Sequence, residues 1–482
     1  MFSKFNLPRV IALWVVAALT LSGCNTRIGE DPPAVDPYKY QGAACLSESG
    51  ATIKKFIEGN AANYEVGALW DCVNSAVSEF KKNVQGSTKN QFTSQELATF
   101  LENNFIDQSK GPQRMSKELQ LELMKVKTLL VGGTVQYVTR SELELAAKTF
   151  TTLRDVSITI NPYMKVFAMN WTVSGANNMQ KDMQFFEDAN SAIQKGGETL
   201  ASMIEKNGRS YVLSDCYNLL TELSKFLKEK WEFTETVKKY MPVVQKIKKA
   251  ISGGNENEVA PSEWPRFVML GARGYVQYLR YYYFIQAAPE TGSAYRLAYL
   301  SRTVEDILSV FQDLVAKKPE GVVSREEVTD LLMTLSKAWP DFKMSAPLIT
   351  EVMKVKRLFF GGSTDSFTTV DFNTARLKIS RLKALIERFM PYYAIYGGER
   401  DPSLYSTDEA QKIFMESQFI LEASGRELGV LVESSYDLRD IVSLIAEFEK
   451  LYPPTRKSDS LTEAVKKYIP AAIDAKKNKA DG

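Results

Sequence analysis

Thiols and carboxylates are the reactive side chains of this chain, because its 482 residues include four cysteines and 58 acidic residues but no histidine. The lack of histidine excludes Ser-His-Asp and Cys-His catalysis, imidazole proton transfer and histidine-ligated zinc. The scattered cysteines form no thiolate cluster motif, and no Walker loop, dinucleotide glycine fingerprint or EF-hand loop with spaced acids occurs. We therefore expect no metal, no cofactor and no identifiable catalytic residue. The alternative is an enzyme that uses carboxylates alone, such as a glycosidase.

Cys24 is placed where its thiol could form a thioether with lipid. A basic segment with Lys4 and Arg9 precedes an apolar run over residues 10–21, and Leu-Ser-Gly-Cys occupies residues 21–24. Twelve helical residues reach only about 18 Å, whereas the hydrocarbon core is roughly 30 Å thick, so the run predicts a signal sequence rather than a membrane span. The motif resembles the lipobox of bacterial lipoproteins. That resemblance implies cleavage after residue 23 and lipidation of Cys24.

The lipobox resemblance also implies where the protein resides. Each buried CH₂ contributes about 0.8 kcal/mol, and two or more acyl chains hold a protein stably at a membrane. In enterobacterial lipoproteins an Asp after the cysteine causes retention at the inner membrane, so Asn25 favours the outer membrane, facing the periplasm or the cell surface.

Without residues 1–23 the basic and acidic residues balance at 58 each, which argues against a nucleic-acid partner.

Three cysteines remain after the lipidated one, in a compartment that permits disulfides. Cys45 lies at the start of the folded part and Cys72 on an early helix, so we predict a disulfide between them, although sequence alone leaves other pairings open. Cys216 would then be an unpaired thiol inside a helix, where cysteine is most often buried.

The chain contains an internal duplication. Residues 124–134 (Met-Lys-Val-Lys-Thr-Leu-Leu-Val-Gly-Gly-Thr) match residues 353–363, and residues 237–242 match residues 465–470. The apolar residues recur at helical spacing. We predict an all-α fold with two tandem homologous multi-helix domains at residues 45–250 and 266–482, packed as bundles or as a short solenoid. Residues 251–265 are predicted to be a linker, and the proline-containing residues 24–44 a flexible tether.

Helix ends are predicted at matching places in the two copies. A Ser or Thr followed three residues later by an acid predicts a capping box. Such pairs are Thr93–Glu96, Thr139–Glu142, Ser324–Glu327 and Thr368–Asp371. Glycine pairs at residues 132–133 and 361–362 predict helix C-termini. Residues 156–160 alone resemble a strand, but their counterparts at 385–389 have a helical pattern, so both are predicted helical up to the prolines that follow.

A second resemblance concerns the folded part. Residues 69–76 (Leu-Trp-Asp-Cys-Val-Asn-Ser-Ala) and the leucine-rich helix that closes on Gly-Gly-Thr resemble helical lipoproteins of Bdellovibrio-type predatory bacteria. This resemblance implies a helical, lipid-anchored protein and implies no activity.

An aromatic run in the second copy has two interpretations. Tyr275, Tyr278 and Tyr282 share one helix face, which is typical of core at the junction between the copies. The other interpretation is a tyrosine-rich surface that contacts a partner protein or glycan.

Lysines gather at several helix ends, again with two interpretations. Lys246, Lys248 and Lys249 are typical of a solvated helix face, or of a contact with anionic lipid headgroups. The pairs at residues 125 and 127, and at residues 354 and 356, precede the glycine pairs, where a cation interacts favourably with the helix dipole.

These observations predict a lipid-anchored, non-enzymatic envelope protein that acts as a helical scaffold or as a binding module. Its partners would be the membrane, through the N-terminal lipid, and an envelope protein or polymer. The alternative is a histidine-free enzyme that uses carboxylates to act on envelope glycans. Two close acids with raised pKa in a deep cleft would favour that alternative.

Overall fold

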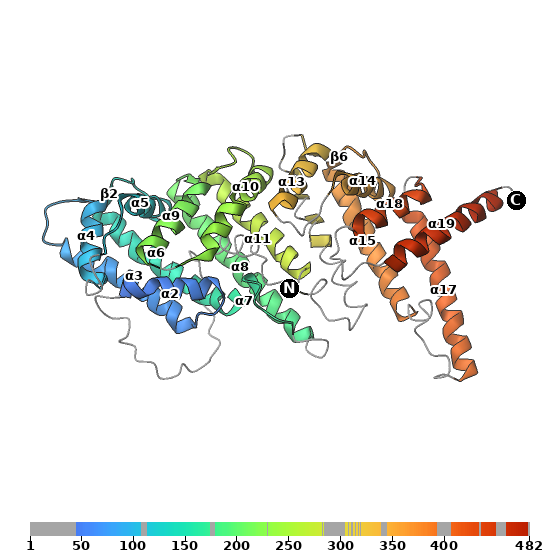
Figure 1. Cartoon of the computed structure of the whole chain (residues 1–482), viewed down its shortest axis with the longest axis horizontal. Coiled ribbons are helices and arrows are strands. Elements are labelled where there is room, and N and C mark those ends of the chain that lie inside the picture. Colours follow the sequence, from blue (N-terminus) through green and yellow to red (C-terminus); the bar gives the residue numbers. More distant parts are fainter. Residues whose placement is uncertain are drawn as a thin grey trace. The chain divides into compact units, whose positions relative to one another are not determined.

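The computed structural model describes residues 45–107, 113–173, 179–228, 230–281, 283, 304–306, 308–309, 312–313, 315–316, 318, 320–338, 345–392, 406–432, 435–449 and 459–480. Most of these residues are helical and the strands are two or three residues long, so the predicted all-α class is confirmed (Figure 1). Cys24, the predicted signal sequence and the tether lie outside the described residues. The chain divides at Tyr283 into two compact units, unit 1 before the boundary and unit 2 after it.

Unit 1 contains helices and three-residue 3-10 turns (η), with short strands between them. In chain order its elements are α2 (Cys45–Ile57), α3 (Asn63–Asn83), β1 (Gln91–Thr93), α4 (Ser94–Phe105), α5 (Lys117–Val131), β2 (Tyr137–Thr139), α6 (Arg140–Ile160), η2 (Asn161–Tyr163), α7 (Met164–Phe167), α8 (Met179–Asn207), β3 (Tyr211–Val212), α9 (Leu213–Phe226), α10 (Glu232–Ser252), β4 (Glu258–Val259), η4 (Pro261–Glu263) and α11 (Trp264–Tyr281).

Unit 2 repeats the same kinds of element. In chain order they are β5 (Val322–Ser324), α13 (Arg325–Ala338), α14 (Ala346–Phe360), β6 (Ser366–Thr368), α15 (Thr369–Phe389), η6 (Met390–Tyr392), α17 (Thr407–Leu431), α18 (Leu438–Glu449) and α19 (Asp459–Ala480). As predicted, α6 and α15 are helical up to Ile160 and Phe389, and a 3-10 turn that contains proline follows each.

A smaller pattern recurs inside both units, and we call it a module. A helix leads through a loop and a short strand into a second helix, and a third helix then leads through another loop and strand into a fourth. Module 1 is α3–β1–α4–α5–β2–α6, and module 2 is α8–β3–α9–α10–β4–α11. Module 3 contains β5–α13–α14–β6–α15. Helices α17, α18 and α19 follow in the order of α8, α9 and α10.

The two strands of each module pair with one another. Three two-stranded antiparallel sheets result, β1 with β2, β3 with β4, and β5 with β6. The central partners are Phe92 with Val138, Tyr211 with Val259, and Val323 with Phe367. In module 1 the partners Phe92 and Val138 join one buried cluster with Phe80, Met124 and Leu143. Burial of each such side chain contributes about 1.5–3 kcal/mol, so the sheet and the helices stabilise one another.

Capping boxes start the helices that follow the strands. Thr93 and Thr139 each accept a hydrogen bond from the backbone N–H of the acid three residues later, and that acid accepts one from the backbone N–H of the threonine. The pairs at Ser324 and Thr368 are made in the same way. All four predicted boxes are therefore present.

The structure corrects the prediction of a linker at residues 251–265. Residues 251–252 belong to α10, and β4 lies within the segment and pairs with β3. Helix α11, which was assigned to the second copy, packs against α8 and belongs to unit 1. The physical reason is that the glycines here end a helix and shape a loop, and they do not separate two domains.

Candidate functional site

A lysine, a glycine pair and an acid form the same arrangement in all three modules, and we call each arrangement a lysine loop. The lysine loops are Lys127–Glu142, Lys248–Glu263 and Lys356–Asp371. In each, the acid is the fifteenth residue after the lysine. The lysine lies near the end of the third helix of the module, and the acid lies in the first turn after the second strand.

In the first lysine loop the ammonium is enclosed by oxygens. Lys127 Nζ donates to the carbonyls of Thr134, at 2.9 Å, and Tyr137, at 3.1 Å, and lies 2.8 Å from Glu142 Oε2. The same carboxylate oxygen accepts the backbone N–H of Thr139 at 2.9 Å. An ammonium has three donors, so these three acceptors satisfy it.

The other two lysine loops repeat this cage. Lys356 Nζ donates to the carbonyls of Ser363 and Ser366, at 2.8 and 3.0 Å, and lies 3.0 Å from Asp371 Oδ2. In module 2, Lys248 Nζ donates to the carbonyls of residues 253 and 255 and lies 2.9 Å from Oε2 of the acid at residue 263. The side chain of Lys248 is 0% exposed, so the predicted solvated face at this lysine is wrong.

The second glycine of each pair is required at its position. Gly133, Gly254 and Gly362 have φ of +78°, +64° and +69°, a region that side chains rarely adopt. A Cβ at these positions would lie 1.6, 2.8 and 2.6 Å from a carboxylate oxygen of the lysine loop. The glycine pair therefore ends the helix and also leaves room for the ion pair.

The loops of the three modules share one register. In modules 1 and 3 the second carbonyl acceptor, that of Tyr137 or Ser366, lies five residues before the acid of the lysine loop. The central paired residue of the second strand lies four residues before that acid in every module. The lysine loops are thus held together by an internal charge.

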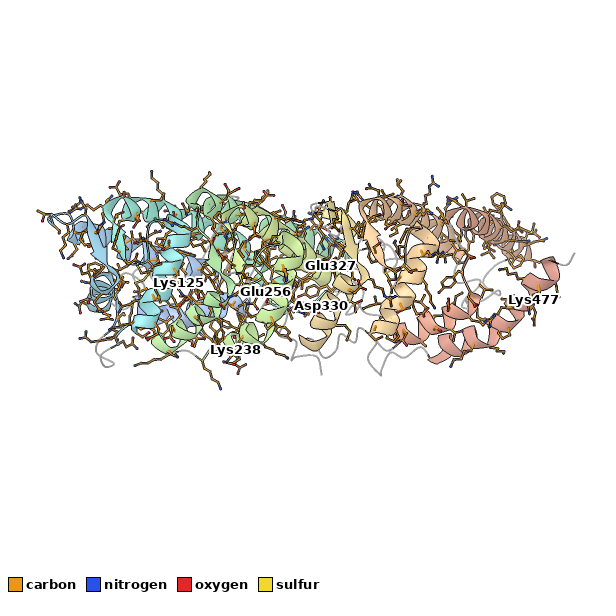
Figure 2. The ribbon with its side chains drawn as sticks, turned by 90° about the horizontal axis from the view of Figure 1, so that it is seen from above. Lys125, Lys238, Glu256, Glu327, Asp330 and Lys477 are labelled. Atoms are coloured by element: carbon orange, nitrogen blue, oxygen red, sulfur yellow. A yellow bond between two sulfur atoms is a disulfide. The ribbon has the colours of Figure 1, made fainter. Side chains whose placement is uncertain are left out.

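A second polar cluster links the third helix of a module to the second helix of the next. Lys125, labelled in Figure 2, lies 2.9 Å from both Glu122 Oε1 and Asp215 Oδ1. Burial would lower the pKa of Lys125, but the hydrogen bonds from this ammonium to the two acids outweigh burial and raise it. Burial raises the pKa of Glu122.

Unit 2 has the equivalent cluster. Lys354 Nζ lies 3.1 Å from Glu351 Oε1 and 2.9 Å from Asp440 Oδ1. Helix caps are used in the same way, because the hydroxyls of Ser116 and Ser345 each donate to a glutamate of the neighbouring α9 or α18. The expected interaction of these lysines with a helix dipole does not describe their main contacts, which are ion pairs with one acid of the same helix and one acid of the neighbouring helix.

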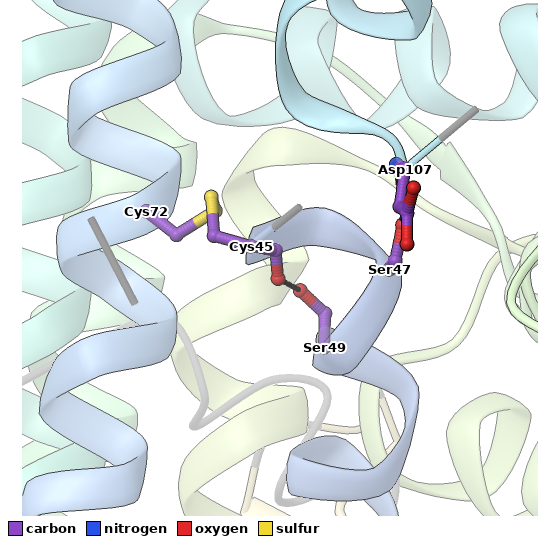
Figure 3. Close-up of a disulfide and its surroundings, with 5 residues drawn as sticks. All are labelled: Cys45, Ser47, Ser49, Cys72 and Asp107. Carbon is purple, nitrogen blue, oxygen red and sulfur yellow. Dashed lines mark hydrogen bonds between the residues drawn. A yellow bond between two sulfur atoms is a disulfide. The ribbon is translucent and has the colours of Figure 1, made fainter. Parts of the chain in front are cut away.

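The structure joins Cys45 of α2 to Cys72 of α3 in a disulfide (Figure 3). Hydrogen bonds hold this end of α2, since the Ser49 hydroxyl donates to the Cys45 carbonyl and the Asp107 N–H donates to the Ser47 hydroxyl. Cys216 is unpaired and buried in α9, as predicted. Burial raises the pKa of its thiol to about 12, so Cys216 is not a reactive nucleophile.

The tyrosines proposed as a partner contact lie on α11. Tyr275 is 2% exposed and its hydroxyl donates to the Phe167 carbonyl at 2.7 Å, so the contact-surface interpretation is wrong for this residue and the core interpretation holds. Tyr275 can be buried because the Phe167 carbonyl accepts the hydrogen bond of its hydroxyl. The side chains of Tyr278 and Tyr282 lie outside the described residues.

Few features of the described residues suit a small ligand. A pocket of about 140 Å³ is lined by Lys54, Ile57, Glu58, Glu232 and Phe233. Typical ligand pockets are about 300–1,000 Å³. No group of His, Cys, Asp and Glu suited to a metal ion occurs among the residues that the structure describes. Within the same residues, no helix has the length and apolar character needed to cross a membrane.

Sequence reasoning detected the lysine loops of modules 1 and 3 only as matched segments, and it missed the loop of module 2. The missed signal was a lysine five residues before a glycine pair and fifteen before an acid. No protein-family model, curated protein or solved structure matches this chain.

Proposed function

We propose that this chain is a lipid-anchored envelope protein whose helical modules form a non-enzymatic scaffold that binds an envelope protein or polymer. The lysine loops carry the proposal. Their lysines and acids recur in all three modules, and in each module they bond to one another and to their own loop. Charges used in this way stabilise a framework and do not bind a substrate.

The contacts between modules also support a scaffold. Lys125 and Lys354 each form an ion pair with an acid of their own helix and with an acid of the neighbouring helix, in the same way in the two units. Stacked helical modules that contact their neighbours through repeated bonds typically present an extended surface for a partner.

The alternative of a carboxylate-dependent enzyme has no observation in its favour. Glu122 has a raised pKa, but the ammonium of Lys125 lies between it and Asp215. A general acid and its partner carboxylate would need an open space between them for the glycosidic bond.

The anchor is tested by intact-mass measurement on protein isolated from its own host membranes. We expect a polypeptide that starts at Cys24 and carries acyl mass, and we expect Cys24→Ala to abolish the acyl mass and membrane retention. Fractionation of Asn25→Asp would test the outer-membrane assignment, because that change is expected to move the protein to the inner membrane.

Binding is tested by crosslinking the lipidated protein in its envelope and comparing the captured partners with those of Cys24→Ala. A single partner enriched with the anchored form supports the proposal. Turnover of envelope glycans by the purified chain, lost in a carboxylate variant, would contradict it.

A further inference from the structure

Helix α17 of unit 2 exposes an apolar stripe that α8 of unit 1 buries. The two helices align without a gap, so that Phe186, Ile193 and Leu200 of α8 correspond to Phe414, Leu421 and Leu428 of α17. The three residues of α8 are 2%, 0% and 0% exposed, whereas those of α17 are 55%, 43% and 40% exposed. These positions recur every seven residues and therefore lie along one side of the helix.

Helix α11 covers this stripe in unit 1. It packs along α8 and buries an apolar face of Val268, Ala272, Tyr275, Val276 and Leu279. The residue after this helix that the structure describes, Tyr283, packs its ring against Phe186. In the described part of unit 2, no helix covers the stripe of α17 in the way that α11 covers the stripe of α8.

Further apolar residues of α17 are exposed on other sides of the helix. Met415, Phe419 and Val430 are exposed, and their counterparts in α8 are Glu187, Ser191 and Ser202. The sequence of α17 is therefore more apolar than that of α8 at these three positions. Single exposed apolar residues are ordinary, so the stripe of three residues along one side of α17 is the feature that marks an interaction surface.

The charged residues of α17 indicate which kind of partner its apolar stripe would bind. The helix contains five acidic and two basic residues, whereas α11, the cover of the equivalent stripe, contains three arginines and no acid. Helices that lie on membrane surfaces are rich in lysine and arginine, so the acidic α17 does not suit an anionic lipid surface. Two copies of α17 side by side would place like charges together, which disfavours a dimer through this helix.

We propose that the apolar stripe of α17 (Phe414, Leu421 and Leu428) binds a basic amphipathic helix of a partner protein. The partner helix has the chemistry of α11, an aliphatic and aromatic face flanked by arginines. This inference deepens the proposed function, since it names the class of partner and the surface that binds it.

The test uses a labelled peptide with the sequence of residues 264–281, titrated with the purified full chain and followed by fluorescence anisotropy. We expect saturable binding. The variant Phe414→Ser/Leu421→Ser should weaken it by about tenfold or more, because central apolar side chains carry most of the binding energy of such interfaces. The matched control is Leu145→Ser, which alters an equally exposed leucine on α6 and should leave binding unchanged. A peptide with Val276→Ser/Leu279→Ser should not bind.

Three outcomes would overturn the proposal. The peptide could fail to bind a chain whose circular dichroism and melting curve show it folded. The substitutions in α17 could instead abolish self-association in light scattering, which would assign the stripe to a second copy. They could abolish sedimentation with phosphatidylglycerol vesicles, which would assign it to lipid. Peptide binding needs no acyl chain, so failure here and failure of the Cys24 experiments are distinguishable.

Discussion

Helices α8 and α17 have the same apolar stripe and opposite surroundings. In unit 1 the stripe is closed by α11, and in unit 2 most of its side chains face solvent. The lysine loops do not differ in this way, since Lys127 and Lys356 have equivalent partners in the two units. The modules therefore share one internal framework and differ in which apolar surface they leave exposed. The framework is structural, and the open stripe is where we expect function.

The largest effect is expected from truncating the covered stripe. Leu200→Ala should lower the free energy of unfolding of unit 1 by about 3–5 kcal/mol, because it leaves a cavity beneath α11. The matched change Leu428→Ala should cost less than about 1 kcal/mol, since that side chain is already 40% exposed. Chemical denaturation of both variants measures the difference. Equal losses would mean that α17 is covered in solution.

Breaking a lysine loop should cost the same in both units. Lys127→Met and Lys356→Met each leave a largely buried carboxylate without its cation, and we expect a loss of about 3 kcal/mol in each case. The control is Lys81→Met, which breaks an exposed ion pair with Glu144 and should cost less than about 1 kcal/mol. A loss in one unit alone would show that the lysine loops do not stabilise the two units equally.

The disulfide distinguishes unit 1, because no cysteine follows Cys216 in the sequence. Cys45→Ser/Cys72→Ser opens a loop of 27 residues and should destabilise α2 and α3 by about 2 kcal/mol. Hydrogen exchange should show faster opening of these helices and no change in unit 2. Faster exchange in both units would indicate that they unfold together.

The smallest effect concerns pH. Burial raises the pKa of Glu122 above its ordinary value of 4.5, so the folded state favours the protonated carboxyl. The stability this contributes is present below pH 4.5 and is lost as pH rises through the raised pKa. Glu122→Gln should therefore gain stability relative to the native chain over that range, measured by denaturation at a series of pH values. A difference that stays constant with pH would contradict the assignment.

Local sequence patterns predicted much of this fold. Capping boxes, glycine C-caps and the helical counterpart of residues 156–160 were predicted correctly, because each depends on neighbouring residues. The all-α class followed from the apolar spacing. The prediction for residues 251–265 was wrong because glycine and asparagine suit both a linker and a tight loop, and the burial of Lys248 and the pairing of β4 with β3 distinguish the two.

Contacts between distant segments were not predictable in the same way. Tyr275 has the same residue type whether it faces a partner or the Phe167 carbonyl. The stripes of α8 and α17 have nearly the same sequence, so their pattern could not indicate that one is covered and the other is open. The carbonyl acceptors of the lysine cages have no sequence signature, so only the spacing of lysine, glycine pair and acid could have indicated them.

Hydrogen–deuterium exchange of the purified full chain, followed by mass spectrometry, tests the central comparison most directly. The shared framework predicts slow exchange in α5, α8, α11 and α14, where buried contacts hold the helix backbone. It predicts faster exchange in α17, which should slow when the peptide of residues 264–281 is added. Exchange in α17 as slow as in α8 without the peptide, or unchanged by it at saturation, would contradict the account.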